Sequence, residues 1–310
     1  MASMLGRFGG WLYQQPYLLV CITYMAWALN IVLGRYVAGH FPPVALSFLR
    51  WGIAFLIILP FAWPYLRRDW PAIRRHLPLL TLLAITGTSA YNTMAYWGLQ
   101  YTQAINALLT QSTAPLMIAL WTFAMYGDRL SRRQVIGILI SLAGVIVILC
   151  RGDIEVLRSI SFNRGDIWFF SALVIFAFYS ALMKKRPAMH PLSFLAFSMG
   201  WGTLWLTPLL VWEMSTGRVA ALDLTNVLTL IYVAIFPSIV AYICYNRALE
   251  LIGPNRVGAL YPLIVAFGAA FAILLLGERP QLFHLVGSVL VLGGAVIATR
   301  KIRVRAPQPG

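Results

Sequence analysis

Apolar residues occur along the chain in ten runs of about twenty positions, and the short breaks between the runs carry most of the charged residues. A helical run of this length crosses a hydrocarbon core of about 30 Å. The runs are continuous and do not alternate with polar residues, which favours helices over a membrane β-barrel. The predicted spans are 17–38, 43–62, 79–99, 104–126, 134–150, 166–183, 191–212, 224–249, 257–276 and 281–299. The pattern therefore predicts an all-α integral membrane protein with ten transmembrane helices.

The last five spans repeat the first five about 150 positions later. The matches at this offset are Gly127-Asp128-Arg129 with Gly277-Glu278-Arg279, Gly137 with Gly287, and Gly144 with Gly294. Because each copy has an odd number of spans, the two copies must cross the membrane in opposite directions, as in many transporters. The expected units are a first five-helix repeat at 17–150, a second, inverted repeat at 166–299, and a basic cytoplasmic tail at 300–310.

Composition and charge support a membrane protein and exclude other classes. The chain is 60% hydrophobic and 11% charged, whereas about 25% of residues are charged in an average soluble protein. Its net charge of +15 comes from basic residues dispersed between the spans, so it does not indicate a nucleic-acid partner. With the N-terminus inside, seventeen Lys and Arg fall on the cytoplasmic side and six on the other. This asymmetry predicts a multi-pass membrane protein with both termini in the cytoplasm.

A proline in the fourth span (Pro115), a short Gly-(Asp/Glu)-Arg turn and a glycine-containing fifth span resemble the EamA-type drug/metabolite transporters. The resemblance covers Tyr17 to Thr299 and is greatest to exporters of aromatic amino acids of the YddG type. It implies that helices 1, 3, 4, 6, 8 and 9 surround a central cavity while helices 5 and 10 are peripheral. The chain departs from the repeat at Val265, since the nearest proline, Pro262, comes three positions earlier. We therefore expect the second half to bend at a different depth.

Residues that weaken helices lie at matching positions in spans 3 and 8. Gly87-Thr88-Ser89 in the first copy corresponds to Pro237-Ser238 in the second. Interrupted helices at equivalent depths indicate hinges next to a substrate site, although glycine and proline also serve ordinary close packing in membrane helices. The candidate hinge residues are Gly87, Pro115, Pro237 and Pro262.

Aromatic, amide and hydroxyl side chains gather at the same depth. The candidate substrate-binding residues are Tyr24, Trp27, Asn30, Ser89, Asn92, Tyr96, Gln111, Ser112, Tyr179, Ser180, Tyr242, Tyr245 and Tyr261. A neutral cavity lined by these groups would stack a planar side chain, and its amides and hydroxyls would bind the ends of an amino acid. The alternative for each residue is ordinary packing or a hydrogen bond between helices.

The distribution of charge bears on energy coupling. All nine carboxylates fall in loops or at span ends, and the four histidines lie in or near loops. Proton relays usually use Asp, Glu or His within the bilayer, so we expect uncoupled transport or exchange. Arg50, which lies inside span 2, either reaches the interface or neighbouring carbonyls, or contacts a substrate carboxylate.

The sequence predicts no catalytic residue, metal site or cofactor. Cys21, Cys150 and Cys244 lack metal-binding spacing, and no G-x-x-x-x-G-K-[ST] loop occurs. Small residues in spans 5 and 10 indicate internal packing or a dimer face, so a monomer or weak dimer is expected. The favoured function is alternating-access export of aromatic and other uncharged amino acids by a protein embedded in the lipid of the bacterial inner membrane. Alternatives are export of a purine, a sugar-linked metabolite or a drug, a lipid-modifying enzyme, and a channel.

Overall fold

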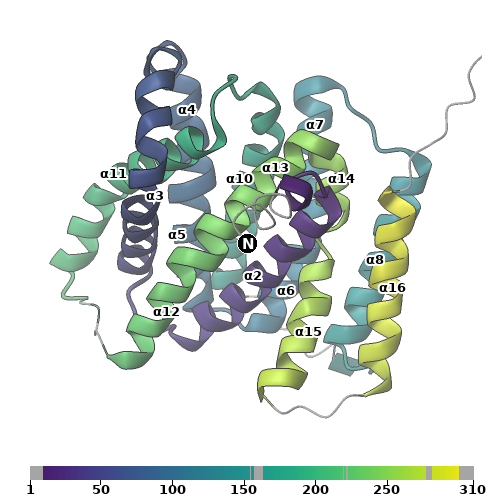
Figure 1. Cartoon of the computed structure of the whole chain (residues 1–310). Helices are drawn as coiled ribbons and strands as arrows, with labels where there is room; N and C mark the ends of the chain where they lie inside the picture. Colours follow the sequence, from purple (N-terminus) through teal and green to yellow (C-terminus); the bar gives the residue numbers. More distant parts are fainter. Residues whose placement is uncertain are drawn as a thin grey trace, which may run out of the picture.

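The computed structural model describes residues 10–153, 155–156, 163–218, 220, 223–276 and 281–299, and its regular elements in these ranges are helices (Figure 1). The first half contains α2 (Pro16–Tyr36), α3 (Pro43–Arg75), α4 (Leu77–Ala84), η1 (Ile85–Ala90), α5 (Tyr91–Leu99), α6 (Ala104–Ser112), α7 (Ala114–Tyr126) and α8 (Arg132–Leu149). The second half contains α10 (Arg164–Leu182), η2 (Met183–Lys185), α11 (Pro191–Ser215), α12 (Leu224–Ala234), η3 (Ile235–Val240), α13 (Ala241–Ile252), α14 (Pro254–Ala259), α15 (Leu263–Leu276) and α16 (Leu282–Thr299).

These helices correspond to the ten predicted spans. Eight helical segments of the described residues are long and apolar enough to cross a membrane, by length and composition. The other two spans are the third, built from α4, η1 and α5, and the ninth, built from α14 and α15. The motif Gly277-Glu278-Arg279 and the predicted tail 300–310 lie outside the described residues. The prediction of a ten-helix membrane fold is confirmed.

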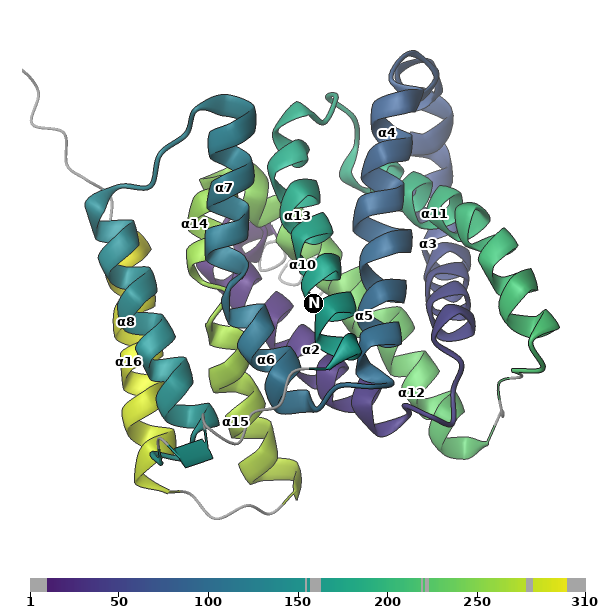
Figure 2. The ribbon, with the colours of Figure 1, turned by 180° about the vertical axis from the view of Figure 1, so that it is seen from behind.

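The pairing of α8 with α16 shows that the repeats are inverted. The two helices lie side by side at one edge of the bundle in both views (Figures 1 and 2). A Cβ on Gly137 would lie against Gly294, and a Cβ on Gly144 would be 2.6 Å from the carbonyl oxygen of Gly287. Residue numbers therefore rise along one helix as they fall along the other. Since α8 and α16 are repeat equivalents, equivalent spans run in opposite directions. The small residues of spans 5 and 10 serve internal packing at these contacts.

In the centre of the bundle, the first helix of each repeat packs against helices of the other repeat. The first-repeat helix α2 packs against α13 and α15, while its equivalent α10 packs against α5 and α7. The ends of α3 and α7 and the start of α4 lie at the top of Figure 1. We call this end of the bundle the basic face, because the basic residues near these helix ends and around the adjoining pocket are Arg67, Arg129, Lys184, Arg186 and Arg256. The other end is called the opposite face.

The predicted end of the second span, residue 62, is wrong as the end of the helix. The apolar run ends near residue 62, but α3 continues to Arg75 and contains Pro60, Pro64 and Pro71. At 1.5 Å per residue, its 33 residues span about 50 Å, so α3 extends beyond a 30 Å hydrocarbon core. Apolarity marks how much of a helix lies in lipid, whereas the hydrogen-bonded backbone can continue into water.

The expected difference in bend depth between the halves is also wrong. The fourth span breaks at Thr113, between α6 and α7, and the ninth breaks at residues 260–262, before α15 begins at Leu263. The start of α15 is one residue out of register with the start of α7 at the 150 offset. Pro115 lies in the first turn of α7, and Pro262 comes directly before α15. Both positions suit proline because the first N–H groups of a helix need no intrahelical partner.

Two carboxylates join α3 to α11 in a reciprocal way. Glu213 near the end of α11 accepts hydrogen bonds from the backbone N–H groups of Val44 (3.1 Å) and Ala45 (2.7 Å), at the start of α3. Asp69 near the end of α3 accepts one from the His190 N–H (2.7 Å), at the start of α11. Each carboxylate supplies an acceptor and negative charge to the first turn of the antiparallel partner helix. The pair therefore holds α3 against α11 at both faces.

We expect Glu213→Ala to lower the free energy of unfolding by about 3 kcal/mol, because it leaves two buried N–H groups without acceptors. Glu213 is 1% exposed, so water does not replace the lost contacts. The measurement is denaturant unfolding of the purified protein in detergent. Asp128→Ala is the control: its carboxylate is 41% exposed and pairs with Lys184, so its loss is expected to cost less than about 1 kcal/mol. Equal effects would contradict the capping role.

Candidate functional site

The eighth span contains a π-helical turn, η3, at the predicted weak point. Pro237 has no N–H to donate to the carbonyl of Val233, four residues earlier. The Ser238 hydroxyl donates to that carbonyl instead, at 2.6 Å. The carbonyl of Pro237 accepts hydrogen bonds from Trp27 Nε1 and from Arg50 Nη2, each at 3.1 Å. The proline thus rearranges the local hydrogen bonds so that backbone and hydroxyl groups face the centre of the bundle.

The third span contains a second π-helical turn, η1, and its residues 85–90 lie 150 positions before those of η3. Its Gly87 carbonyl accepts a short hydrogen bond from the Tyr242 hydroxyl. A Cβ at Gly87 would be 2.5 Å from Cδ2 of Tyr179, so only glycine lets this ring approach the backbone. Each repeat therefore has a π turn at the equivalent position in the centre of the bundle. Such turns within α-helices are frequent at functional sites. Their action as hinges stays a prediction.

Trp27 is the centre of a cluster of five other aromatic rings. Its ring centroid is 4.9 Å from that of Tyr245, 5.3 Å from Phe176, 5.8 Å from Tyr242, 6.0 Å from Tyr24 and 6.2 Å from Tyr261. These side chains come from α2, α10, α13 and the break before α15. This group, called here the Trp27 cluster, brings together five predicted substrate-binding residues from both repeats and Phe176, which was not among the predicted residues.

A polar network adjoins the Trp27 cluster and contains a buried charge. Arg50 donates to Asn92 Oδ1 (2.8 Å), to the Tyr96 hydroxyl (2.7 Å), to Ser238 Oγ (2.6 Å) and to the carbonyl of Pro237. Asn92 in turn donates to the Tyr242 hydroxyl (3.4 Å), its repeat equivalent. Arg50 is 1% exposed. The prediction of a neutral centre is therefore wrong, because α3 turns this arginine toward the repeat interface and away from lipid.

The remaining candidate residues are distributed around this centre. Tyr96 donates to Asn30 Oδ1 at 2.8 Å, which brings Asn30 into the polar network. Tyr179 donates to Asn246 Oδ1 (2.8 Å), and the Ser180 hydroxyl lies 2.7 Å from that of Tyr245. The candidates that bond elsewhere are Ser89 with the carbonyl of Gly202, Ser112 with its own helix at Leu109, and Gln111 with Tyr91.

The predicted cavity is closed in this conformation. Twelve of the thirteen candidate residues are buried, each less than 9% exposed, and Asn30 is half-buried. A pocket of 680 Å³ opens at the basic face, lined by Asp128, Gln134, Ser180, Met183, Lys184, Arg186, Leu249, Glu250, Ile252, Gly253, Pro254, Asn255 and Arg256. A smaller pocket of 430 Å³ lies at the opposite face around His40, Gln100 and Arg218. Since Ser180 contacts Tyr245, the larger pocket ends at the edge of the Trp27 cluster.

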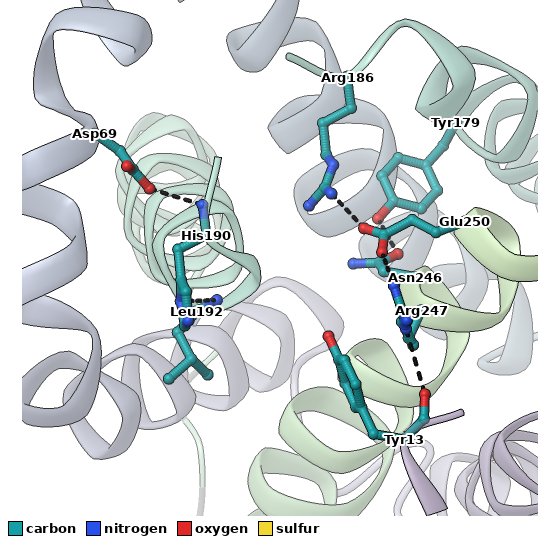
Figure 3. Close-up of polar contacts among 9 residues, drawn as sticks. All are labelled: Tyr13, Asp69, Tyr179, Arg186, His190, Leu192, Asn246, Arg247 and Glu250. Atoms are coloured by element: carbon teal, nitrogen blue, oxygen red, sulfur yellow. Dashed lines mark hydrogen bonds and ion pairs between the residues drawn. The ribbon is translucent and has the colours of Figure 1, made fainter. Parts of the chain in front are cut away.

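Ion pairs border the larger pocket (Figure 3). Glu250 forms a short ion pair with Arg186 and a 3.0 Å ion pair with Arg247. Arg247 also donates to the backbone carbonyl of Tyr13 (3.3 Å). Burial raises the pKa of the Tyr13 phenol, and the negative charge of Glu250 raises it further. These contacts join the segment before α2 to α13 and to the loop after α10.

His190, at the start of α11, is uncharged in its role as a helix cap. Its Nδ1 accepts a hydrogen bond from the Leu192 N–H at 3.3 Å, which requires the neutral ring (Figure 3). Burial lowers the pKa of His190, and the nearby Arg68 lowers it further. The ring also stacks on Tyr65 with centroids 3.5 Å apart. This site therefore belongs to the α3–α11 contact and lies apart from the Trp27 cluster.

Sequence reasoning missed several residues of the centre. Phe176 lies three and four positions before the candidates Tyr179 and Ser180, so helical spacing alone would have placed it on their face. Trp51 packs edge-on against Tyr242, with centroids 5.1 Å apart, and only its position beside Arg50 signalled it. Asn246 gave no signal, because an amide near the end of a span usually faces water.

The chain matches the EamA-like transporter family over residues 14–150 and 163–300. The chain is 27% identical over 283 residues to an uncharacterized transporter, YyaM, of Bacillus subtilis (strain 168), covering 88% of this chain and 89% of the relative. It is 26% identical to a probable amino-acid metabolite efflux pump of Salmonella typhimurium, covering 93% and 95%. It is 27% identical to a probable terminal-alkyne amino-acid exporter of Streptantibioticus cattleyicolor, covering 76% and 78%.

A solved crystal structure shares the fold, with a TM-score of 0.73 at 18% identity, and the match covers 93% of this chain and 96% of that one. The matching family and the relatives named above are transporters and not enzymes.

Proposed function

The chain belongs to the EamA-like transporter family, and we propose that it exports aromatic and other uncharged amino acids by alternating access. The observation that carries this proposal is the Trp27 cluster, in which five aromatic rings from both repeats surround one indole. Aromatic rings favour planar and apolar side chains by stacking and edge-on contacts. The names of two relatives, a probable terminal-alkyne amino-acid exporter and a probable amino-acid metabolite efflux pump, support export of amino-acid compounds. The preference for aromatic side chains, as in exporters of the YddG type, rests on the Trp27 cluster.

In the proposed mechanism, the units 17–150 and 166–299 move relative to each other about their interrupted helices. Gly87, Pro115, Pro237 and Pro262 act as hinges, because π turns and breaks leave the backbone less tightly held than a continuous helix. The 680 Å³ pocket at the basic face is the entry for substrate. Rearrangement of the Trp27 cluster lets the substrate replace ring–ring contacts, and closure of the basic face then opens the opposite one.

Several further properties form part of the proposal. The basic face is cytoplasmic in the bacterial inner membrane, since basic loops remain on that side. The protein acts as a monomer or weak dimer, with α8 and α16 paired within one chain. Transport is uncoupled or proceeds by exchange, because the described buried carboxylates, Asp166 and Glu213, are bonded near helix starts at the opposite face.

The test is flux from proteoliposomes loaded with one labelled solute at a time. We expect phenylalanine, tryptophan and leucine to leave at least tenfold faster than lysine, hypoxanthine or a nucleotide sugar. A pH gradient is expected to change the rate less than twofold. Movement of a purine or sugar compound in place of amino acids would contradict the substrate class, and strict dependence on the pH gradient would contradict uncoupled export. Accelerated exchange with unlabelled substrate on the far side distinguishes a carrier from a channel.

A further inference from the structure

Arg50 lies where the two repeats meet, and its charge is not neutralised by the side chains around it. In the described part of the chain its hydrogen-bond acceptors are an amide, two hydroxyls and a backbone carbonyl, all neutral. The guanidinium lies 4.7 Å from the ring centroid of Trp51, which offsets part of its charge. A cation removed from water without a counter-ion is unfavourable. The site therefore has the electrostatics of an anion receptor.

Arg50 donates hydrogen bonds to a different repeat from each side of its guanidinium group. Nη1 is held within the first repeat by Asn92 and Tyr96. Nε and Nη2 donate instead to the π turn η3 of the second repeat, at Ser238 Oγ and at the carbonyl of Pro237. The Nε–Nη2 edge presents two parallel N–H groups, the geometry with which arginine binds both oxygens of a carboxylate. The preferred carboxylate-binding edge is thus occupied by η3.

The same carbonyl connects this edge to the Trp27 cluster. Pro237 O accepts from Arg50 Nη2 and from Trp27 Nε1. A solute whose carboxylate lies on the Nε–Nη2 edge therefore has its side chain next to the indole. A single cation matches one negative charge, so the site suits a monocarboxylate better than a phosphate or diphosphate.

We propose that Arg50 binds the carboxylate of the transported solute, and that this carboxylate replaces Ser238 Oγ and Pro237 O on the Nε–Nη2 edge. The proposal rests on the amino-acid transport proposed above. Because Asn92 and Tyr96 still hold Nη1, the arginine stays in place while η3 is released from the first repeat. Substrate binding in this way frees one of the two central π turns and couples occupancy to movement of the repeats.

The transport test compares L-phenylalanine with L-phenylalaninamide, which lacks the carboxylate, in proteoliposomes. Wild-type protein is expected to move phenylalanine at least tenfold faster than the amide. Arg50→Gln is expected to slow phenylalanine at least tenfold and to change amide flux less than threefold. Arg35→Gln is the matched control, since Arg35 donates to the carbonyl of Leu99 at a span end, and it is expected to keep the wild-type preference. An Arg50→Gln protein that keeps this preference would overturn the proposal.

A binding test on wild-type protein keeps the proposal testable if Arg50→Gln does not fold. Phenylalanine and 3-phenylpropionate are expected to raise the unfolding temperature in detergent, and phenylalaninamide is not. Ser238→Ala removes the competitor for Nε, so it is expected to lower the half-saturating concentration of either carboxylate at least threefold. If Arg50 had only a structural role, Ser238→Ala would not lower the half-saturating concentration of either carboxylate. If wild-type liposomes move no amino acid, the proposed function fails. If neither carboxylate stabilises the protein, the Arg50 site fails.

Discussion

Gly294→Val is expected to lower the free energy of unfolding by about 3 kcal/mol, at the upper end of the cost of overpacking a closely packed site. A Cβ at Gly294 would be 2.7 Å from the backbone nitrogen of Ser141 and closer still to the carbonyl of Gly137. Backbone atoms cannot rotate away, so α8 and α16 must separate. Separation breaks the hydrogen bond from Ser141 Oγ to the carbonyl of Val291 (3.1 Å) and the van der Waals contact that holds membrane helices together.

The measurement is unfolding of purified protein in detergent, with the recovered folded fraction as a second readout. Gly293→Val is the control, because Gly293 is exposed and a Cβ there meets no atom within 4 Å. It is expected to change the free energy of unfolding by less than about 0.5 kcal/mol. By the inverted symmetry, Gly144→Val should match Gly294→Val, since its Cβ would be 2.6 Å from the carbonyl of Gly287. Equal stability of the adjacent variants Gly293→Val and Gly294→Val would contradict the α8–α16 contact.

Trp27→Ala is expected to cost about 3–5 kcal/mol of stability, the range for removing a large buried aromatic side chain. Trp27 is 5% exposed, and its loss removes the common neighbour of five rings. It also removes the Nε1 hydrogen bond to the carbonyl of Pro237 at 3.1 Å. We therefore expect the selectivity for phenylalanine over lysine to fall at least tenfold in the folded fraction. Unfolding in detergent and flux from proteoliposomes measure the two effects separately.

Trp205→Ala provides a matched tryptophan control on α11. Its side chain is 49% exposed, so it lies on the surface of the bundle and its removal leaves the Trp27 cluster intact. We expect a stability loss below about 1 kcal/mol and unchanged selectivity. Trp27→Phe then separates the effect of the ring from that of the hydrogen bond, because stacking is largely kept while the carbonyl of Pro237 loses the indole donor. A Trp27→Ala protein with wild-type selectivity would exclude the Trp27 cluster from the substrate path.

Much of the fold could be predicted because it depends on features that are local in the sequence. Helix number follows from apolar runs of membrane length, and inversion follows from the 150-residue offset combined with five spans per copy. The π turn η3 was predictable as a weak point, since Pro237 removes a backbone donor in any helical context. Internal packing was the favoured use of the small residues in spans 5 and 10, but the partner of Gly144 could not be predicted, because a stripe of small residues does not specify which helix it contacts.

The sequence predicted which residues belong to the candidate site better than it predicted how they are arranged. The predicted residues that come together in one cluster, because each occupies a similar depth in a central span, are Tyr24, Trp27, Tyr242, Tyr245 and Tyr261. Ser89 and Ser112 bond outside it, since depth along a helix does not specify the direction in which a side chain points. Direction depends on how each helix is rotated against its neighbours.

The membrane class, the ten spans, the inverted repeat and the positions where helices weaken could all be predicted, since each follows from hydropathy, spacing or a helix-weakening residue. The position of Arg50 inside the bundle depends instead on how the helices pack. The helical periodicity of span 2 allows this arginine to face lipid, water or protein, and the packing of α3 against α5 and η3 selects the last. A second contact, that of α3 with α11, places the carboxylate of Glu213 at the start of α3. Residues about 170 positions apart become partners there because they are close in space, which their separation along the chain does not predict.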